Sequence, residues 1–194
     1  GVDTQQFLED EGWIDLMDQK GEALFVLEPG AEGWGSAAEE KAYMDAAIAF
    51  LKSGRNEAGI NVFSTFGEFY LAGYGEGAAP LEAWAAENPI FVISQAFVNA
   101  ASAGKAVLEE AGSVLYDGSN TSGFKTDAEF QAVLKECGME QIARKDVPVP
   151  TWFAGTSSAD SVDYWKEAND CVSNADGEGV YRQDKDSDAI QTAF

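Results

Sequence analysis

The chain has 194 residues, 45% of them hydrophobic, which is enough for a single domain (residues 1–194) with a substantial core. Its 34 acidic residues outnumber 12 basic ones, and the resulting net charge of −22 repels phosphate backbones and anionic lipids. Nucleic acids and membrane surfaces are therefore poor candidate partners, and no apolar run approaches the ~18 residues that a membrane-spanning helix needs.

The acidic composition and the two cysteines, Cys137 and Cys171, bear on where the protein works. A strongly acidic surface favours solubility and suits an extracellular or a salty setting, so we expect an extracellular, secreted protein. Two cysteines are too few to define a disulfide framework, and they leave open whether the pair is bridged.

The first predicted elements are a helix, a strand and a longer helix. Residues 7–17 have the spacing of a short amphipathic helix, which stops at Gly21. Residues 22–27 form a short apolar run closed by a Glu-Pro-Gly turn, which predicts a buried strand. Ser36 and Glu39 have the spacing of a capping box, and the helix that they open is expected to end at Gly54.

From residue 60 onwards, strand-like and helix-like segments follow one another. Such alternation predicts an α/β fold with a mostly parallel sheet and helices on both faces. The strand-like segments are residues 60–63, 69–72, 90–93 and 147–154, and the helical ones are residues 78–88, 126–137 and 161–168, with an acidic loop expected over 174–188.

The Gly-x-Gly-x-Gly sequence at residues 73–77 is the most informative motif. It follows a strand and precedes a helix, as the nucleophile elbow G-x-S-x-G does in serine hydrolases. The central position is Gly75, which offers no nucleophile, and the chain has no histidine to act as a general base. Alternatively, the motif is an ordinary tight turn in which Gly73 and Gly77 allow close packing of the helix on the strand.

Short segments along nearly the whole chain resemble the polyhydroxybutyrate-depolymerase and feruloyl-esterase group of secreted α/β-hydrolases. These are Gly-Trp (12–13), Asp-Gln-Lys-Gly (18–21), Glu-Pro (28–29), Trp-Gly (34–35), Tyr-Leu-Ala-Gly-Tyr (70–74), Ala-Trp-Ala-Ala-Glu-Asn-Pro (83–89), Val-Pro-Thr-Trp-Phe-Ala-Gly-Thr (149–156), Tyr-Trp (164–165) and Asn-Asp-Cys (169–171). The resemblance implies an α/β-hydrolase-like fold that lacks the family's first strands and its histidine-bearing C-terminal segment.

The resemblance also assigns site positions. Gly75 occupies the nucleophile position, and the backbone N–H of Glu76 corresponds to an oxyanion-hole donor. Asp160 matches the acid that orients the family's histidine, and Asp163 is the weaker match. With no histidine to orient, Asp160 is alternatively the cap of the helix that follows it.

Aromatic and acidic side chains supply the remaining candidates. Trp34, flanked by glycines, and Tyr74, next to the elbow, are expected to line a ligand cleft. Asp184, Asp186 and Asp188 alternate like calcium ligands, but they lack the turn glycine and the distal glutamate of an EF-hand. We therefore expect no cofactor, and no metal site built on His or Cys.

Three functions follow from these observations. The first is a non-catalytic esterase or depolymerase homologue that binds an ester, a polymer or another protein. The second is a carboxylic-ester hydrolase of polyester or feruloyl type, truncated, completed by a second polypeptide, or inactivated by substitution at Gly75. The third is a structural or surface-assembly protein, in which a second polypeptide completes the sheet.

Overall fold

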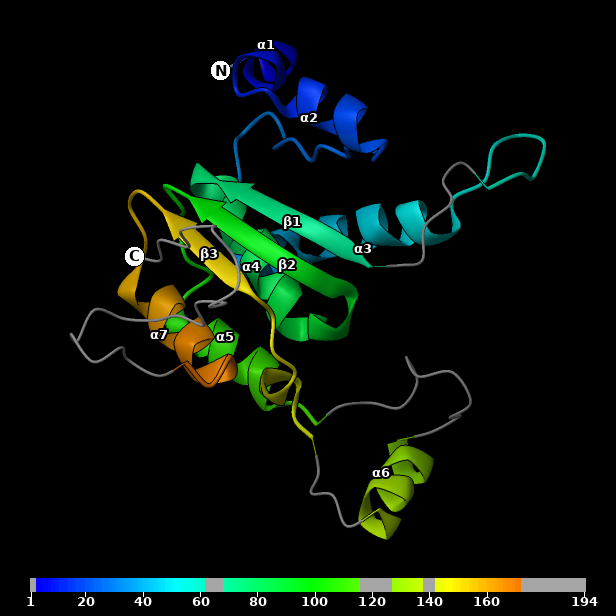
Figure 1. Ribbon diagram of the computed structural model, residues 1–194, viewed down its shortest axis with the longest axis vertical. Helices are drawn as coiled ribbons and strands as arrows, with labels where there is room; N and C mark the ends of the chain where they lie inside the picture. Colours follow the sequence, from blue (N-terminus) through cyan, green and yellow to red (C-terminus); the bar gives the residue numbers. More distant parts are fainter. Residues whose placement is uncertain (1–2, 62–67, 116–126, 138–141, 172–194) are drawn as a thin grey trace.

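The computed structural model describes residues 3–61, 68–115, 127–137 and 142–171, and over these it is an α/β fold (Figure 1). Three strands form one all-parallel sheet in the order β1-β2-β3: β1 (Phe69–Tyr74), β2 (Val92–Val98) and β3 (Thr151–Ala154). The helices are α1 (Thr4–Asp10), α2 (Trp13–Lys20), α3 (Ala37–Ser53), α4 (Ala78–Glu87), α5 (Lys105–Ser113), α6 (Asp127–Glu136) and α7 (Ala159–Ala168).

Most helix boundaries lie where the sequence places them. The capping box of Ser36 and Glu39 opens α3, which ends before Gly54, and α4 ends before Asn88. The predicted N-terminal helix is instead two helices, α1 and α2, because Gly12 adopts a left-handed φ of 75° that interrupts helical geometry. Helix α2 stops at Gly21, which is also left-handed.

The strand predicted over residues 22–27 is absent, and this prediction is wrong. Leu24, Phe25 and Val26 are exposed instead of buried. A strand needs a neighbouring strand to satisfy its backbone groups, and the only described partner of β1 is β2. Apolar composition alone therefore does not form a strand here.

The other strand predictions needed smaller corrections. Strand β1 extends to Tyr74, β2 begins only after a 3-10 turn at Pro89–Phe91, and β3 is limited to Thr151–Ala154. The predicted segment at 60–63 contains no strand in its described part, where Ile60 is exposed, and its remainder lies outside the described residues. Helix α5 was not predicted, and the loop expected over 174–188 also lies outside the described residues.

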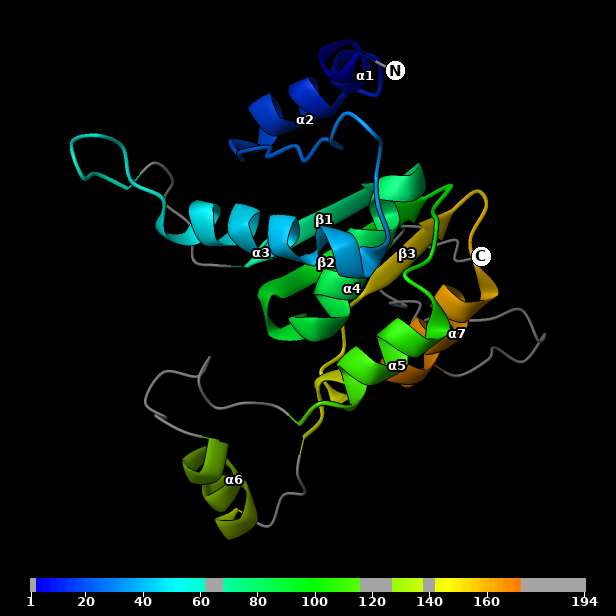
Figure 2. The same cartoon turned by 180° about the vertical axis from the view of Figure 1, so that it is seen from behind.

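Helix α4 packs on one face of the sheet, and α1 and α2 contact the last residue of β1, Tyr74, on the other face. Helix α4 packs on β1 and β2, while α3 and α5 pack against α4. Helices α3 and α4 lie in front of the sheet in Figure 2 and behind it in Figure 1. On the opposite face, Tyr70 is 72% exposed and Trp152 is 48% exposed. We call this second surface the open face.

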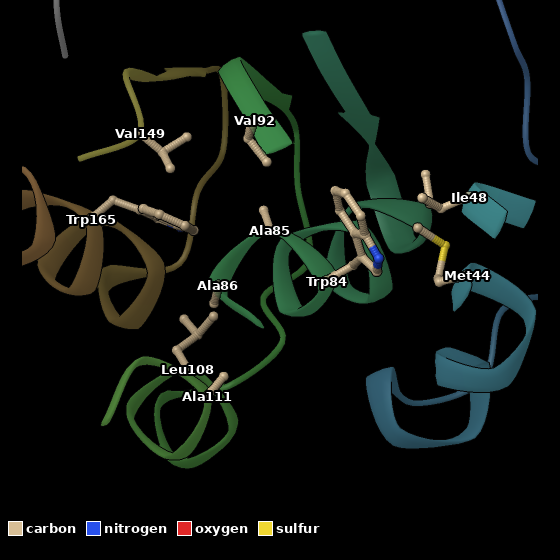
Figure 3. Packing of buried hydrophobic residues seen from close by; sticks show 10 residues of the cluster. All are labelled: Met44, Ile48, Trp84, Ala85, Ala86, Val92, Leu108, Ala111, Val149 and Trp165. Carbon is tan, nitrogen blue, oxygen red and sulfur yellow. The ribbon is translucent and has the colours of Figure 1, made fainter. Parts of the chain in front are cut away.

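The hydrophobic core lies between α4 and the surrounding helices (Figure 3). Helix α4 passes through its centre and contributes Trp84, Ala85 and Ala86. The other members are Met44 and Ile48 of α3, Leu108 and Ala111 of α5, Val92 of β2, Trp165 of α7, and Val149. Among the described residues, no helix is long and apolar enough to cross a membrane.

Candidate functional site

The turn between β1 and α4 has the shape that the motif predicts. Strand β1 ends at Tyr74, residues Gly75–Gly77 form one 3-10 turn, and α4 begins at Ala78. Gly75 adopts a φ of 53°, in the left-handed region that disfavours residues with a side chain. Nucleophile elbows also place their serine on a turn from a strand into a helix.

The three glycines of this turn are required for different reasons. A Cβ atom at Gly73 would lie 2.9 Å from the Cα of Ala78 and 2.9 Å from Cδ1 of Phe97. A Cβ atom at Gly77 would lie 2.8 Å from Nε1 of Trp34. A Cβ atom at Gly75 would meet nothing within 4 Å, so only its φ favours glycine there. A side chain at position 75 would therefore have room to extend from the turn.

Tyr74 connects the elbow to the N-terminal helices. Its hydroxyl accepts a hydrogen bond from Nε1 of Trp13 at 3.1 Å, and its ring meets Phe7 edge-on at a centroid distance of 5.1 Å. Helices α1 and α2 consequently lie at the carboxyl end of β1, above its arrowhead in Figure 1. The tyrosine is thus engaged in packing on both its ring and its hydroxyl.

Trp34 packs over the exit of the same turn, against Gly77, and its ring lies 6.2 Å from that of Tyr43. The nearby surface has a hollow of about 430 Å³, lined by residues 28–33, Glu40 and Tyr43. Neither Trp34 nor Tyr74 is among the residues that line this hollow. Three of its lining residues are glutamates, at positions 28, 32 and 40.

Asp160 lies in the first turn of α7 and is exposed. The cap of this helix is Ser158, whose Oγ accepts the backbone N–H of Asp160 at 3.2 Å. The expectation that Asp160 caps the helix is therefore wrong. The N-cap is Ser158, and Asp160 lies inside the helix. A carboxylate in the first turn still interacts favourably with the helix dipole.

The loop after β2, residues 99–104, joins the elbow to the loop after β3. The N–H of Ala101 donates to the Gly75 carbonyl at 2.8 Å, and the N–H of Ala100 donates to the Thr156 carbonyl at 2.9 Å. The Oδ1 atom of Asn99 accepts the N–H of Thr156 at 3.0 Å. The carboxyl ends of the three strands thus meet at one edge, which is where parallel α/β sheets bind ligands.

The sequence analysis did not identify two residues that hold the loop after β2, Asn99 and Glu82. Asn99 adopts a φ of 47°, and asparagine directly after a strand is a signal for such a turn. Glu82 of α4 is buried, with Oε2 accepting the N–H of Ala103 at 2.8 Å and Oε1 accepting Nε1 of Trp165 at 3.0 Å. Burial raises the pKa of the Glu82 carboxyl. Nothing in the sequence pattern distinguishes this glutamate from the many exposed ones.

No group of three or more His, Cys, Asp or Glu side chains is placed to hold a metal in the part of the chain that the structure describes. The aspartates at 184, 186 and 188 lie outside that part. Cys137 and Cys171 are both exposed free thiols. Comparison with protein-family models, with curated proteins and with solved structures finds no significant match to this chain.

Proposed function

We propose that this chain is a non-catalytic relative of the esterase-like α/β-hydrolases, which binds an ester or polymer ligand at the carboxyl edge of its sheet. The observation that carries the proposal is Gly75 itself. It lies on a left-handed strand-to-helix turn with open space around its missing side chain. The site thus has the backbone shape of an elbow without the nucleophile.

The other groups at the carboxyl edge of the sheet favour binding of a ligand but not its hydrolysis. Glu76 is the second residue of the 3-10 turn leading into α4, where backbone N–H groups lack partners within the helix. Such a donor stabilises negative charge on a ligand oxygen, but attack requires a hydroxyl and a base. Gly75 supplies no hydroxyl and the chain has no histidine. Loss of triad members removes a factor of about 10⁴–10⁶ in rate, while binding survives.

The proposal is tested with p-nitrophenyl butyrate and methyl ferulate as probes. We expect no measurable hydrolysis by the chain, and a saturable change in its tryptophan fluorescence on addition of methyl ferulate. Gly75→Ser is expected to bind the probe without hydrolysing it, because the serine would still lack a base. A matched control, Gly59→Ser, introduces a serine at an exposed glycine outside this turn, which has a left-handed φ of 73° and open space around it like Gly75.

Three outcomes would change the proposal. Hydrolysis by the unmodified chain would overturn the non-catalytic proposal and favour the ester-hydrolase alternative. Hydrolysis by Gly75→Ser but not by Gly59→Ser would mean that the residue at position 75 alone inactivates an otherwise complete enzyme. An absence of any saturable fluorescence change would remove the ligand-binding part of the proposal.

A second candidate function, binding of another polypeptide, is favoured by the open face. Tyr70 and Trp152 are exposed there, and none of the 6, 7 and 4 residues of β1, β2 and β3 is charged. Uncharged sheet surfaces and edges are usually covered by other polypeptide. Because each copy carries a charge of −22, a partner of different sequence is favoured over a second copy.

Sedimentation velocity from low to high salt tests this second candidate. We expect a monomer at all salt concentrations, together with Nile red binding that Trp152→Asp reduces. A dimer that appears at high salt and is lost in Trp152→Asp would identify a second copy as the partner. An absence of dye binding would contradict an open apolar face.

A further inference from the structure

Glu82 is a buried carboxylate bound by neutral groups. Its side chain lies on α4 and is 1% exposed. Each oxygen accepts a separate N–H, Oε2 from Ala103 at 2.8 Å and Oε1 from Trp165 at 3.0 Å. In the part of the chain that the structure describes, no lysine or arginine forms an ion pair with it. A buried carboxylate without a counter-ion favours its protonated form.

The groups around Glu82 come from three parts of the fold. Ala103 belongs to the loop of residues 99–104, Trp165 belongs to α7, and Glu82 itself belongs to the helix that starts at the elbow. The same loop and α7 also meet directly, since the Ser161 hydroxyl donates to Oγ of Ser102 at 2.7 Å. Glu82 is thus the point at which α4, the loop and α7 are joined.

Besides α4, two residues of the loop connect this junction to the turn at Gly75. Ala103 is bound to Glu82, and Ala101 donates its N–H to the Gly75 carbonyl at 2.8 Å. A loop held at both positions is fixed beside the turn. If the bond at Ala103 opens, the segment next to Gly75 loses one of its anchors.

Glu82 is the group of this junction that changes charge in the ordinary pH range. Tyr164 faces it from α7, but burial, with smaller contributions from Glu82 and Glu167, raises the pKa of Tyr164 to about 12. The residues that α3 and α5 bury are uncharged. Burial raises the pKa of Glu82, and its hydrogen bonds from Ala103 and Trp165 offset that effect in part.

We propose that Glu82 is a proton-linked latch, which holds the loop of residues 99–104 and α7 against α4 and thereby keeps the carboxyl edge around Gly75 closed. In the closed junction the carboxyl is desolvated, and in the open junction water solvates it. The closed junction therefore binds the proton more tightly than the open one. Its stability is complete below the ordinary carboxyl pKa of 4.5 and is lost as pH rises through the higher pKa of the closed state.

The indole N–H of Trp165 reports on the carboxylate directly. In ¹H–¹⁵N spectra recorded from pH 4 to 8, we expect this signal to titrate with a midpoint above 4.5. The indole N–H of Trp13 is the matched control, because it donates to the neutral hydroxyl of Tyr74. Trp165→Phe and Trp13→Phe assign the two signals. In Glu82→Gln, the Trp165 signal is expected not to titrate.

Opening of the latch is measured by hydrogen exchange at the Ala103 amide. Its protection factor is expected to fall by up to about tenfold per pH unit above pH 4.5, and to stay constant in Glu82→Gln. The Asn88 amide, which donates to the Trp84 carbonyl at the other end of α4, is expected to show no such fall.

Should Glu82→Gln not fold, Trp165→Phe replaces it in the exchange experiment. Removing a donor from the ionised carboxylate raises the Glu82 pKa further, so the fall in Ala103 protection should move to higher pH.

The proposal is overturned by a Trp165 indole signal that does not titrate, by a midpoint below 4.5, or by an identical titration in Glu82→Gln. It is also overturned if Trp165 titrates while Ala103 protection stays constant.

Discussion

Beneath α4, Phe97 of β2 is 1% exposed, whereas Trp152 of the neighbouring strand, on the opposite face of the sheet, is 48% exposed. Both are large aromatic residues in strands that carry no charge. The difference arises because Gly73 lets α4 approach β1 and Phe97 closely, whereas on the other face the described helices α1 and α2 contact β1 at its last residue, Tyr74. Burial in this sheet is thus determined by where a helix can approach, and not by the composition of the strands.

Truncating one aromatic residue on each face tests this comparison and gives the largest expected effect. Phe97→Ala is expected to lower the free energy of unfolding by about 3–5 kcal/mol, because it leaves a cavity in the core. Trp152→Ala is expected to lower it by less than about 1.5 kcal/mol, because about half of its surface is already in water. Urea unfolding followed by circular dichroism measures both. Equal losses would mean that the open face is buried in solution.

The strand-to-helix turn at residues 73–77 and the alternation of strands and helices could be predicted from the sequence because they depend on local signals. The glycine spacing at 73–77 and the capping box at Ser36 each depend on residues that are close together in the sequence. The strand expected over 22–27 failed because strand formation depends on a partner elsewhere in the chain. The same holds for Glu82, whose burial depends on Ala103 and Trp165, both distant in sequence.

The closeness of α4 to the covered face is tested at Gly73. Gly73→Ala is expected to destabilise the fold by about 1–3 kcal/mol, since the added Cβ would lie 2.9 Å from the backbone of Ala78. Gly75→Ala has free space, and its cost is limited to the left-handed φ, about 1–2 kcal/mol. Thermal unfolding of both variants measures the two costs.

Gly30→Ala provides the baseline for this pair. Position 30 has open space around it and no left-handed φ, so the substitution is expected to be neutral or to stabilise by about 0.4–1 kcal/mol. If Gly73→Ala proves no more costly than Gly30→Ala, helix α4 does not pack on β1 as closely as described.

At the carboxyl end of β1, Tyr74→Phe tests how the N-terminal helices are held. The substitution removes the acceptor of the Trp13 indole N–H but keeps the ring that packs on Phe7. We expect a loss of about 0.5–1.5 kcal/mol, since one partly buried hydrogen bond is lost. Faster limited proteolysis within residues 3–30, with the sheet core unaffected, is the expected measurement. Uniformly faster cleavage along the chain would contradict this local role.

The smallest effect is expected at Gln95, although it lies on the same covered face as Phe97 and is 3% exposed. Its Nε2 donates to Oγ1 of Thr151 at 2.8 Å, but its Oε1 is buried without a partner among the described residues. Gln95→Met keeps the length of the side chain and removes this unpaired acceptor, which offsets the lost hydrogen bond. The free energy of unfolding is therefore expected to change by less than about 1 kcal/mol in urea titrations.

Thr151→Val is the matched control for Gln95→Met. It leaves the Gln95 amide unpaired, and it is expected to lower the free energy of unfolding by about 1–3 kcal/mol. A loss in Gln95→Met as large as that in Phe97→Ala would show that the covered face depends on a polar contact at Oε1 as well as on apolar packing beneath α4.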